Sequence, residues 1–170
     1  MTVIFKLVET SEEIEQVAEL AHKIWREHYN PIVGNAQVEF MLEKFQSPNP
    51  ISKQIQEDNY FYYLLQDSGK NVGYCAFQAR GDSLFLSKIY VDSSERGRGF
   101  GRAIMEFAKE SAIKLGLKTL SLTVNKDNSD SIAVYKKIGF KVVEEICPDI
   151  GGGYVMDDYV MELTLRSVSS

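Results

Sequence analysis

The sequence is poor in the features that mark secreted and membrane-spanning proteins. Its two cysteines, Cys75 and Cys147, lie far apart without metal-ligand spacing, so we expect two buried free thiols rather than a disulfide. No apolar run approaches the roughly 18 to 20 residues that a membrane-spanning helix needs. The N-terminal stretch lacks the long apolar core and the small-residue cleavage site of a signal peptide. We therefore expect a cytoplasmic protein without a membrane partner.

Positive charge is also scarce. The 170 residues include 19 Lys and Arg against 24 Asp and Glu, a formal net charge of −5. Binding of nucleic acid calls for a broad basic face, so we expect no nucleic-acid partner. The 44% apolar and 25% charged residues are typical of a globular protein. We expect residues 1–166 to form a single domain and residues 167–170 to be a frayed tail.

Hydrophobic periodicity predicts a chain of mixed helices and strands. The pattern predicts strands at 3–8, 60–67, 72–80, 83–92, 119–125, 141–146 and 159–165, and helices at 11–29, 38–45, 103–115 and 129–140. Thr10 and Glu13 form a capping-box pattern before the first helix, and we expect Pro31 and Gly34 to break the chain after it. The segment SPNP (47–50) should close the second helix, with a short helical turn at 51–56. The order β-α-α-β-β-β-α-β-α-β-β predicts an α/β (α+β) protein with one mixed sheet of about seven strands and helices on both faces.

One short stretch contrasts with this acidic background. Residues 96–102 read RGRGFGR, with three glycines and three arginines where the strand pattern changes to a helical pattern. The first amides of a helix lack intrahelical acceptors, and the helix dipole adds positive charge there. Glycines let the backbone come close to a ligand, so the stretch predicts an anion site for a phosphate or pyrophosphate. The alternative is a solvated turn whose glycines serve only the backbone conformation.

Two common phosphate-binding patterns do not fit this stretch. The dinucleotide-binding pattern G-x-G-x-x-G needs a glycine where Arg102 stands. The P-loop pattern G-x-x-x-x-G-K-[ST] does not occur in the sequence. The pattern that fits is R-G-x-G-x-G/A, which begins at Arg96 and follows the predicted strand LSKIYV.

This pattern resembles the pyrophosphate loop of the GNAT superfamily of acetyl-CoA-dependent N-acetyltransferases. A second segment agrees, because it resembles the superfamily's N-x-x-[AS]-x-x-x-Y-x-x-x-G-F pattern at Asn128, Ser131, Tyr135, Gly139 and Phe140. The resemblance implies the GNAT fold, whose mixed sheet is mostly antiparallel, and the order of elements agrees over nearly the whole chain. Within the superfamily the chain looks most like free-standing bacterial spermidine and other polyamine N-acetyltransferases.

The resemblance also implies how acetyl-CoA binds, without a metal. The residues expected to bind it are Ile89, Tyr90, Val91, Arg96, Gly97, Arg98, Gly99, Phe100, Gly101, Arg102 and Asn128. Backbone amides of residues 97–102 would hold the pyrophosphate, and the side chains of Arg96 and Arg98 would add contacts. The main chain of residues 89–91 would pair with the pantetheine arm like an extra strand, and Asn128 would bond to the same arm. An amide near Val91 would support the developing oxyanion.

Acetyl transfer to an amine requires proton transfer at two places. An alkylamine has a pKa near ~10 and is mostly protonated at neutral pH, whereas the leaving thiolate, with a pKa of roughly 8.5, leaves better beside a proton donor. The motif tyrosine is the general acid in the family, which assigns that role to Tyr135; a core tyrosine is the alternative. Many relatives carry a glutamate for the base where this chain has Ser87. The base is left open between an ordered water chain and His28.

The acceptor amine is expected to bind to side chains of the first two helices, the hairpin and the last loop. The candidates are Trp25, His28, Tyr29 and Asp157, because aromatic faces and carboxylates together can bind a cation. Core positions for the aromatic residues and a turn role for the aspartate are the alternatives.

These observations predict an enzyme that transfers acetyl from acetyl-CoA to a primary amine. Direct attack in a ternary complex is expected, because neither cysteine lies in a nucleophilic motif. A small molecule such as a polyamine is the expected acceptor, and a peptide or protein amine is the alternative. A catalytically idle domain that binds acyl-CoA is a third alternative, because Ser87 stands where many relatives carry the glutamate base. The resemblance also implies a homodimer through the last strands.

Overall fold

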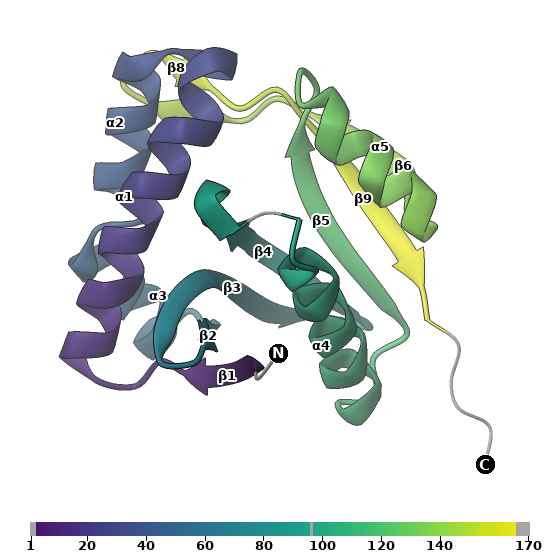
Figure 1. Cartoon of the computed structure of the whole chain (residues 1–170). Coiled ribbons are helices and arrows are strands. Elements are labelled where there is room, and N and C mark those ends of the chain that lie inside the picture. Colours follow the sequence, from purple (N-terminus) through teal and green to yellow (C-terminus); the bar gives the residue numbers. More distant parts are fainter. Residues whose placement is uncertain (1–2, 96, 166–170) are drawn as a thin grey trace. The chain divides into compact units, whose positions relative to one another are not determined.

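The computed structural model describes residues 3–95 and 97–165, without the side chain of Lys88. Its elements, shown in Figure 1, are β1 (Val3–Leu7), α1 (Ser11–Val33), α2 (Asn35–Phe45), α3 (Pro48–Glu57), β2 (Phe61–Asp67), β3 (Lys70–Arg80), β4 (Ser83–Val91), the short 3-10 helix η1 (Ser93–Glu95), α4 (Phe100–Lys114), β5 (Thr119–Asn125), α5 (Ser129–Ile138), β6 (Lys141–Ile146), β7 (Asp149–Gly151), β8 (Tyr154–Val155) and β9 (Asp158–Thr164). The predicted order is present, and α3 and the small β7–β8 hairpin are additions to it.

The main sheet has the strand order β1-β2-β3-β4-β5-β9-β6. Among the strand pairs with a described register, only β4–β5 is parallel, with residues 83–86 opposite 119–122. The mixed, mostly antiparallel sheet predicted from the sequence is thereby confirmed. The chain divides into two compact units: residues up to 78 and 88–106 form the first unit, and residues 79–87 and those from 107 onward form the second.

Helix α1 begins as its sequence predicts but ends later. The Thr10 hydroxyl accepts a hydrogen bond from the Glu13 amide (3.1 Å), and the Glu13 carboxylate accepts one from the Thr10 amide (2.9 Å), which confirms the capping box. The expected break at Pro31 is wrong, because the helix continues to Val33. A proline so close to the end of a helix removes one backbone bond without stopping the chain. Gly34, with φ of +89°, ends the helix.

The first unit contains a group of three helices, of which α3 is longer than the sequence predicts. Helices α1, α2 and α3 pack against one another (Figure 1). The segment SPNP, expected only to close α2, also opens α3: Ser47 is the N-cap and Pro48 is the first helical residue. Proline suits that position because its missing N–H would have no intrahelical acceptor there. The expected helical turn at 51–56 is therefore part of a ten-residue helix.

The core of the first unit includes a buried chain of hydrogen bonds. The Trp25 indole donates to the Tyr74 hydroxyl (2.8 Å), which donates to the side-chain carbonyl of Gln46 (2.8 Å). The Gln46 amide donates to the Tyr62 hydroxyl (3.1 Å), which in turn donates to Gln54. Gln46, Tyr62 and Tyr74 have no exposed surface. Because each buried polar group has a partner, the network connects α1, α2, α3, β2 and β3 without the cost of an unsatisfied group.

The second unit is built on β5, β9 and β6, which Figure 1 shows as neighbouring arrows with α5 alongside. Side chains of β5 alternate between buried and half-buried, as expected for a strand with one face in a core. Cys147, between β6 and β7, is exposed, so the expectation of two buried thiols holds for Cys75 but is wrong for Cys147. Among the described helices, none combines the length and apolar character needed to cross a membrane.

Candidate functional site

The glycine loop, residues 97–102, lies after η1 in the first unit and includes the first three residues of α4. Gly97 and Gly99 have φ of +82° and +84°, a conformation that side-chain-bearing residues rarely adopt. A Cβ placed on Gly97, Gly99 or Gly101 would meet no atom within 4 Å, so the space beside all three is open. Phe100, the first residue of α4, is only 1% exposed and anchors the end of the loop in the core.

The loop presents the free amides of a helix N-terminus. The first helical bond of α4 runs from the Ala103 amide to the Gly99 carbonyl (3.0 Å). The amides of residues 100–102 precede that bond, so they have no acceptor within the helix. With the helix dipole behind them, they form a site that suits an anion. The open space beside the glycines would admit a phosphate group close to these amides.

The strand that leads into the loop is held by tight backbone packing. The Asp92 amide donates to the Val72 carbonyl (2.8 Å), which ties the chain just beyond β4 to β3. A Cβ on Gly73 would lie 2.5 Å from the Tyr90 carbonyl oxygen, so only glycine fits there. Ile89, Tyr90 and Val91, the residues expected to pair with the pantetheine arm, are half-buried at this strand end.

Carboxylates surround the junction between β4 and the loop. The Asp92 carboxylate accepts bonds from the Lys23 ammonium (2.7 Å) and from the Ser94 amide (3.1 Å). The Ser93 hydroxyl donates to Glu27, so α1 contributes two side chains to the junction. These contacts fix the backbone that precedes the glycines.

The arginines of the loop differ in their surroundings. The Arg98 guanidinium donates to Glu95 (2.6 Å) and to Asp67 (2.7 Å), and these bonds raise its pKa. Arg102 is exposed, and no described residue forms an ion pair with it. Arg96, the third arginine of the motif, lies outside the described residues.

An aromatic cluster lies beside the strand end in the first unit. The Tyr29 and Tyr90 hydroxyls are 2.7 Å apart, and the Trp25 ring contacts both tyrosines edge-on at 5.5 and 5.6 Å. The His28 ring packs against Tyr29 at 4.7 Å. The structure thus brings together three of the four expected acceptor residues, although Trp25 is only 3% exposed and its indole N–H is bonded to Tyr74.

The second unit holds the expected general acid. Tyr135 lies on α5, and its ring contacts Phe140 edge-on at 5.8 Å. Burial raises the pKa of Tyr135 to about 12, because a phenolate loses hydration there. Asn128 is the N-cap of α5, and its side-chain carbonyl accepts a bond from the Ser131 amide (3.3 Å). The motif asparagine therefore has a structural role in starting the helix that carries Tyr135.

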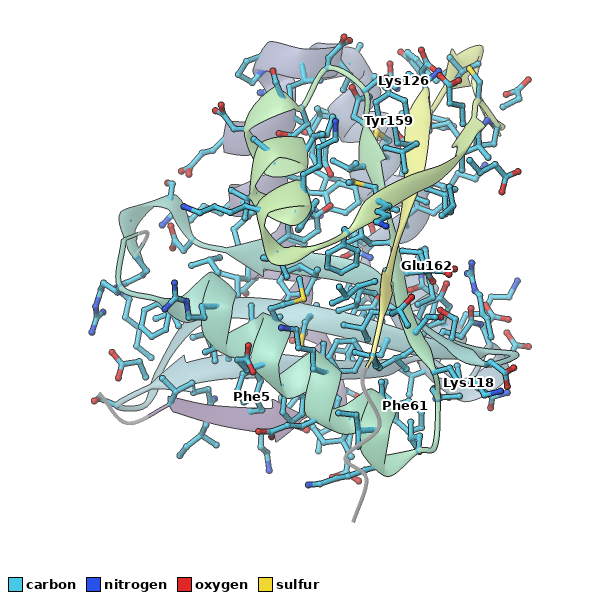
Figure 2. The ribbon with its side chains drawn as sticks, turned by 90° about the vertical axis from the view of Figure 1, so that its right-hand side faces the viewer. Phe5, Phe61, Lys118, Lys126, Tyr159 and Glu162 are labelled. Carbon is cyan, nitrogen blue, oxygen red and sulfur yellow. The ribbon has the colours of Figure 1, made fainter. Side chains whose placement is uncertain are left out.

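Asp157, the fourth expected acceptor residue, belongs to a charged cluster in the second unit. The Lys126 ammonium pairs with Asp157 (2.9 Å) and Glu145 (3.0 Å), and both carboxylates raise its pKa. Lys126 also lies over the Tyr159 ring at 5.5 Å, and Figure 2 shows these two labelled side chains next to each other. Asp157 is thus already paired with a cation of the chain itself.

Sequence reasoning missed Asp67, Lys70 and Glu95, which contact the arginine of the loop or each other. Lys70 donates to Glu95 at 2.6 Å, and Glu95 is 7% exposed. Asp67 and Lys70 flank a hairpin turn nearly 30 residues before the loop, and nothing in the motif points to them. The only signal was Glu95 itself, an acidic residue directly before a basic loop.

Comparison with known proteins finds acetyltransferases that are similar to this chain in sequence or in structure. The chain is 33% identical over 85 residues to the ribosomal protein bS18 alanine N-acetyltransferase of Escherichia coli, a match that covers 50% of this chain and 57% of that relative. The chain thus spans little more than half the length of this curated relative. Among solved structures, the PaiA N-acetyltransferase of Thermoplasma acidophilum in complex with coenzyme A has a TM-score of 0.79 at 19% identity, covering 96% of this chain and 99% of that one. A spermidine N-acetyltransferase chimera derived in part from Vibrio cholerae has a TM-score of 0.68 at 15% identity, with 96% of each chain covered.

These structural likenesses support the GNAT fold, and the family itself is shown by a sequence model. The model of the acetyltransferase (GNAT) family matches residues 16–140. That range contains the glycine loop and the segment from Asn128 to Phe140, which carry the two motifs. The chain therefore belongs to the acetyltransferase (GNAT) family.

Proposed function

We propose that this chain is an N-acetyltransferase that transfers acetyl from acetyl-CoA directly to a primary amine. The observation that carries the proposal is the glycine loop, where two left-handed glycines and an open face lead into the free amides of α4. GNAT acetyltransferases use acetyl-CoA, and a structural neighbour was solved with coenzyme A. The loop fits that ligand because its pyrophosphate needs several N–H donors and close backbone approach.

In this proposal the glycine loop and the end of β4 bind different parts of acetyl-CoA. The amides of residues 100–102 bind the pyrophosphate oxygens, and the guanidinium of Arg102, which forms no ion pair with a described residue, adds positive charge. The main chain of residues 89–91 binds the pantetheine arm, which places the thioester at the end of β4. When bound, acetyl-CoA supplies the activated acetyl group; the chain's residues hold it and control protons.

Tyr135 is the proposed donor to the departing sulfur. Its raised pKa keeps the hydroxyl protonated at neutral pH, so a donor is always present. A tyrosine with an ordinary pKa near ~10 is already a weaker acid than the thiol, whose pKa is roughly 8.5, and burial of Tyr135 widens this difference. We therefore propose that Tyr135 mainly stabilises the leaving thiolate through a hydrogen bond and does not protonate it completely.

The acceptor is proposed to be a small primary amine that binds at the aromatic cluster of Tyr29, Tyr90 and His28. Paired hydroxyls and aromatic edges in the first unit support this class, since they combine polar and apolar contacts. Polyamines are included, and spermidine belongs in the first test. A peptide amine is the second candidate, favoured by the likeness to the alanine N-acetyltransferase of Escherichia coli.

The test is release of free thiol from acetyl-CoA in the presence of an acceptor panel. The panel contains spermidine, an amino sugar, free amino acids and a peptide with an N-terminal alanine. Turnover with one class and not the other assigns the acceptor. Binding of acetyl-CoA without turnover on any acceptor would overturn the enzymatic proposal in favour of an idle acyl-CoA-binding domain.

Two variants separate binding from catalysis. Tyr135→Phe should lower kcat about ten- to hundredfold, the loss expected for one hydrogen bond to a charged atom, with nearly unchanged affinity for acetyl-CoA. Gly99→Glu should abolish acetyl-CoA binding, because it adds bulk and negative charge at a position with left-handed backbone. Unchanged turnover in the first variant would exclude Tyr135 as the donor, and tight binding in the second would place the pyrophosphate elsewhere.

We also propose that the protein acts in the cytoplasm. The free thiol of Cys147 is exposed, and an exposed thiol persists best in a reducing compartment. A fusion to a fluorescent protein, followed by microscopy and cell fractionation, would test this location.

A further inference from the structure

We propose that Asp67, Lys70, Glu95 and Arg98 form a brace that holds the glycine loop in its anion-binding shape. Arg98 is then a positioning residue and does not itself contact the phosphates. This inference rests on the proposed function, in which the loop binds acetyl-CoA. It assigns a role in cofactor affinity to the turn between β2 and β3, far from the loop in sequence.

The four side chains form one connected set of charge-assisted bonds. Lys70 Nζ lies 2.6 Å from Glu95 Oε1, and Arg98 Nη1 lies 2.6 Å from Glu95 Oε2. Arg98 Nη2 lies 2.7 Å from Asp67 Oδ2. The Glu95 and Asp67 side chains are only 9% and 11% exposed, so both carboxylates are largely shielded from water. Hydrogen bonds from Lys70 and then Arg98 lower the pKa of Glu95, which keeps it charged.

The brace ends on the tight turn between β2 and β3. Asp67 and Lys70 face each other across the hairpin turn of β2 and β3. The two turn residues, Ser68 and Gly69, have φ of +52° and +83°, as in the tight turns that match the twist of paired strands. A carboxylate on such a turn keeps its position, so it can fix the position of the arginine that it binds.

Arg98 is also held from the side of α4. Its guanidinium lies 4.9 Å from the centre of the Phe100 ring, and Phe100 is buried as the first residue of that helix. Arg98 stands between Gly97 and Gly99, the two residues with left-handed backbone. Glycine makes that conformation accessible but does not select it. The two ion pairs of Arg98 and its contact with the Phe100 ring supply the selection.

The charge balance argues against Arg98 as a phosphate ligand. Lys70 and Arg98 carry two positive charges, and Asp67 and Glu95 carry two negative charges, so the set is neutral. A phosphate approaching Arg98 would also approach both carboxylates. Arg102 forms no ion pair with a carboxylate in the described part of the chain and is the better source of positive charge for the ligand.

The two possible roles of Arg98, as a brace or as a phosphate ligand, predict different effects of one substitution on the affinity for coenzyme A. If Arg98 binds phosphate, Asp67→Asn removes a competing negative charge and should leave coenzyme A affinity unchanged or increase it. If Arg98 is a brace, the same change loosens the loop and should weaken coenzyme A binding about three- to tenfold. Glu95→Gln should act in the same direction, because Glu95 binds both cations.

The experiment measures Kd for coenzyme A by calorimetry and steady-state kinetics for acetyl-CoA. In Asp67→Asn and Glu95→Gln we expect a higher Kd and KM with nearly unchanged kcat, since the chemistry lies elsewhere. Affinity for S-acetylpantetheine, which lacks the pyrophosphate, should not change. Asp82→Asn is the matched control, because Asp82 is an exposed residue at another hairpin turn. A general loss of stability would instead affect both ligands and lower the melting temperature.

Arg98→Lys provides a second test. Lysine keeps the charge but has one donor nitrogen in place of the two guanidinium nitrogens that bond Glu95 and Asp67, so the brace predicts a loss similar to that in Asp67→Asn. The double variant Asp67→Asn with Arg98→Lys should then bind coenzyme A no more weakly than either single variant. Wild-type affinity in Asp67→Asn, or full affinity in Arg98→Lys, would overturn the brace. Failure of the proposed function would look different, because the wild-type protein itself would not bind coenzyme A.

Discussion

The Gly73→Ala substitution should disturb the strand end at which acetyl-CoA is proposed to bind. A Cβ on Gly73 would lie 2.5 Å from the Tyr90 carbonyl oxygen and 3.3 Å from the Val91 Cα. Both are backbone atoms, so no side-chain rotation can relieve the contact. The Tyr90 carbonyl must move by at least 0.5 Å to reach the 3.0 Å below which such contacts essentially never occur.

A shift of this size has two measurable consequences. Overpacking between two neighbouring strands should lower the free energy of unfolding by about 1–3 kcal/mol. The main chain of residues 89–91 would also be displaced from its position toward the pantetheine arm. Misplacement approaching 1 Å near a reacting group can lower the rate on the order of a hundredfold, so we expect kcat/KM for acetyl-CoA to fall about ten- to hundredfold. Urea denaturation and thiol-release kinetics measure the two effects.

Gly101→Ala is the matched control for this prediction. Its Cβ would meet no atom within 4 Å, its backbone has ordinary φ, and the resembled motif accepts alanine at that position. We expect the control to keep wild-type stability or to gain slightly from better helix propensity. If Gly73→Ala retained both wild-type stability and wild-type kcat/KM, the close approach of β3 to β4 would not constrain this site.

Three further predictions concern buried groups. Gln46→Leu should lower the free energy of unfolding by about 1–3 kcal/mol, because the Tyr74 hydroxyl loses its acceptor. Urea denaturation measures this loss, and Gln56→Leu on the exposed face of α3 is the control. Burial raises the pKa of Tyr62, Tyr74 and Tyr135 above the ordinary value near 10. The tyrosines of the unfolded state therefore ionise first, and the free energy of unfolding should fall as the pH rises from about 10 to 12. Phenolate absorbance that reaches its full value by about pH 10.5 in the folded protein would contradict this. Cys147 should react at once with a thiol reagent and Cys75 only after unfolding, because Cys75 is fully buried and burial raises its pKa; two rapid equivalents would refute that assignment.

Local signals in the sequence predicted most of the elements. Alternating apolar residues marked β5, and the capping box at Thr10 and Glu13 marked the start of α1, because both depend on neighbours within a few residues. The errors arose where local rules allow two outcomes. Proline can end a helix or lie within its last turn, as Pro31 does, and it can also open one, as Pro48 does.

In the candidate site, too, some features were predictable from the sequence and others depend on packing. The composition of residues 96–102 pointed to an anion-binding loop, and the resemblance to the GNAT motif pointed to Tyr135. The exposure of Cys147 and the bonded state of Trp25 depend on packing partners that no spacing identifies. From the sequence we also expected the positive charge of Arg98 to face the pyrophosphate, although in the structure Asp67 and Glu95 pair with it.

By itself, the sequence determined the family, the order of the main elements and the position of the anion-binding loop. The family follows from the resemblance of two motifs, and the elements and the loop follow from periodicity, capping and backbone freedom, which act between residues close together in the chain. Only the tertiary structure decided which charges surround the loop, because electrostatic interactions depend on distance in space. Asp67 and Lys70 reach Glu95 and Arg98 only after the β2–β3 hairpin has formed and packed.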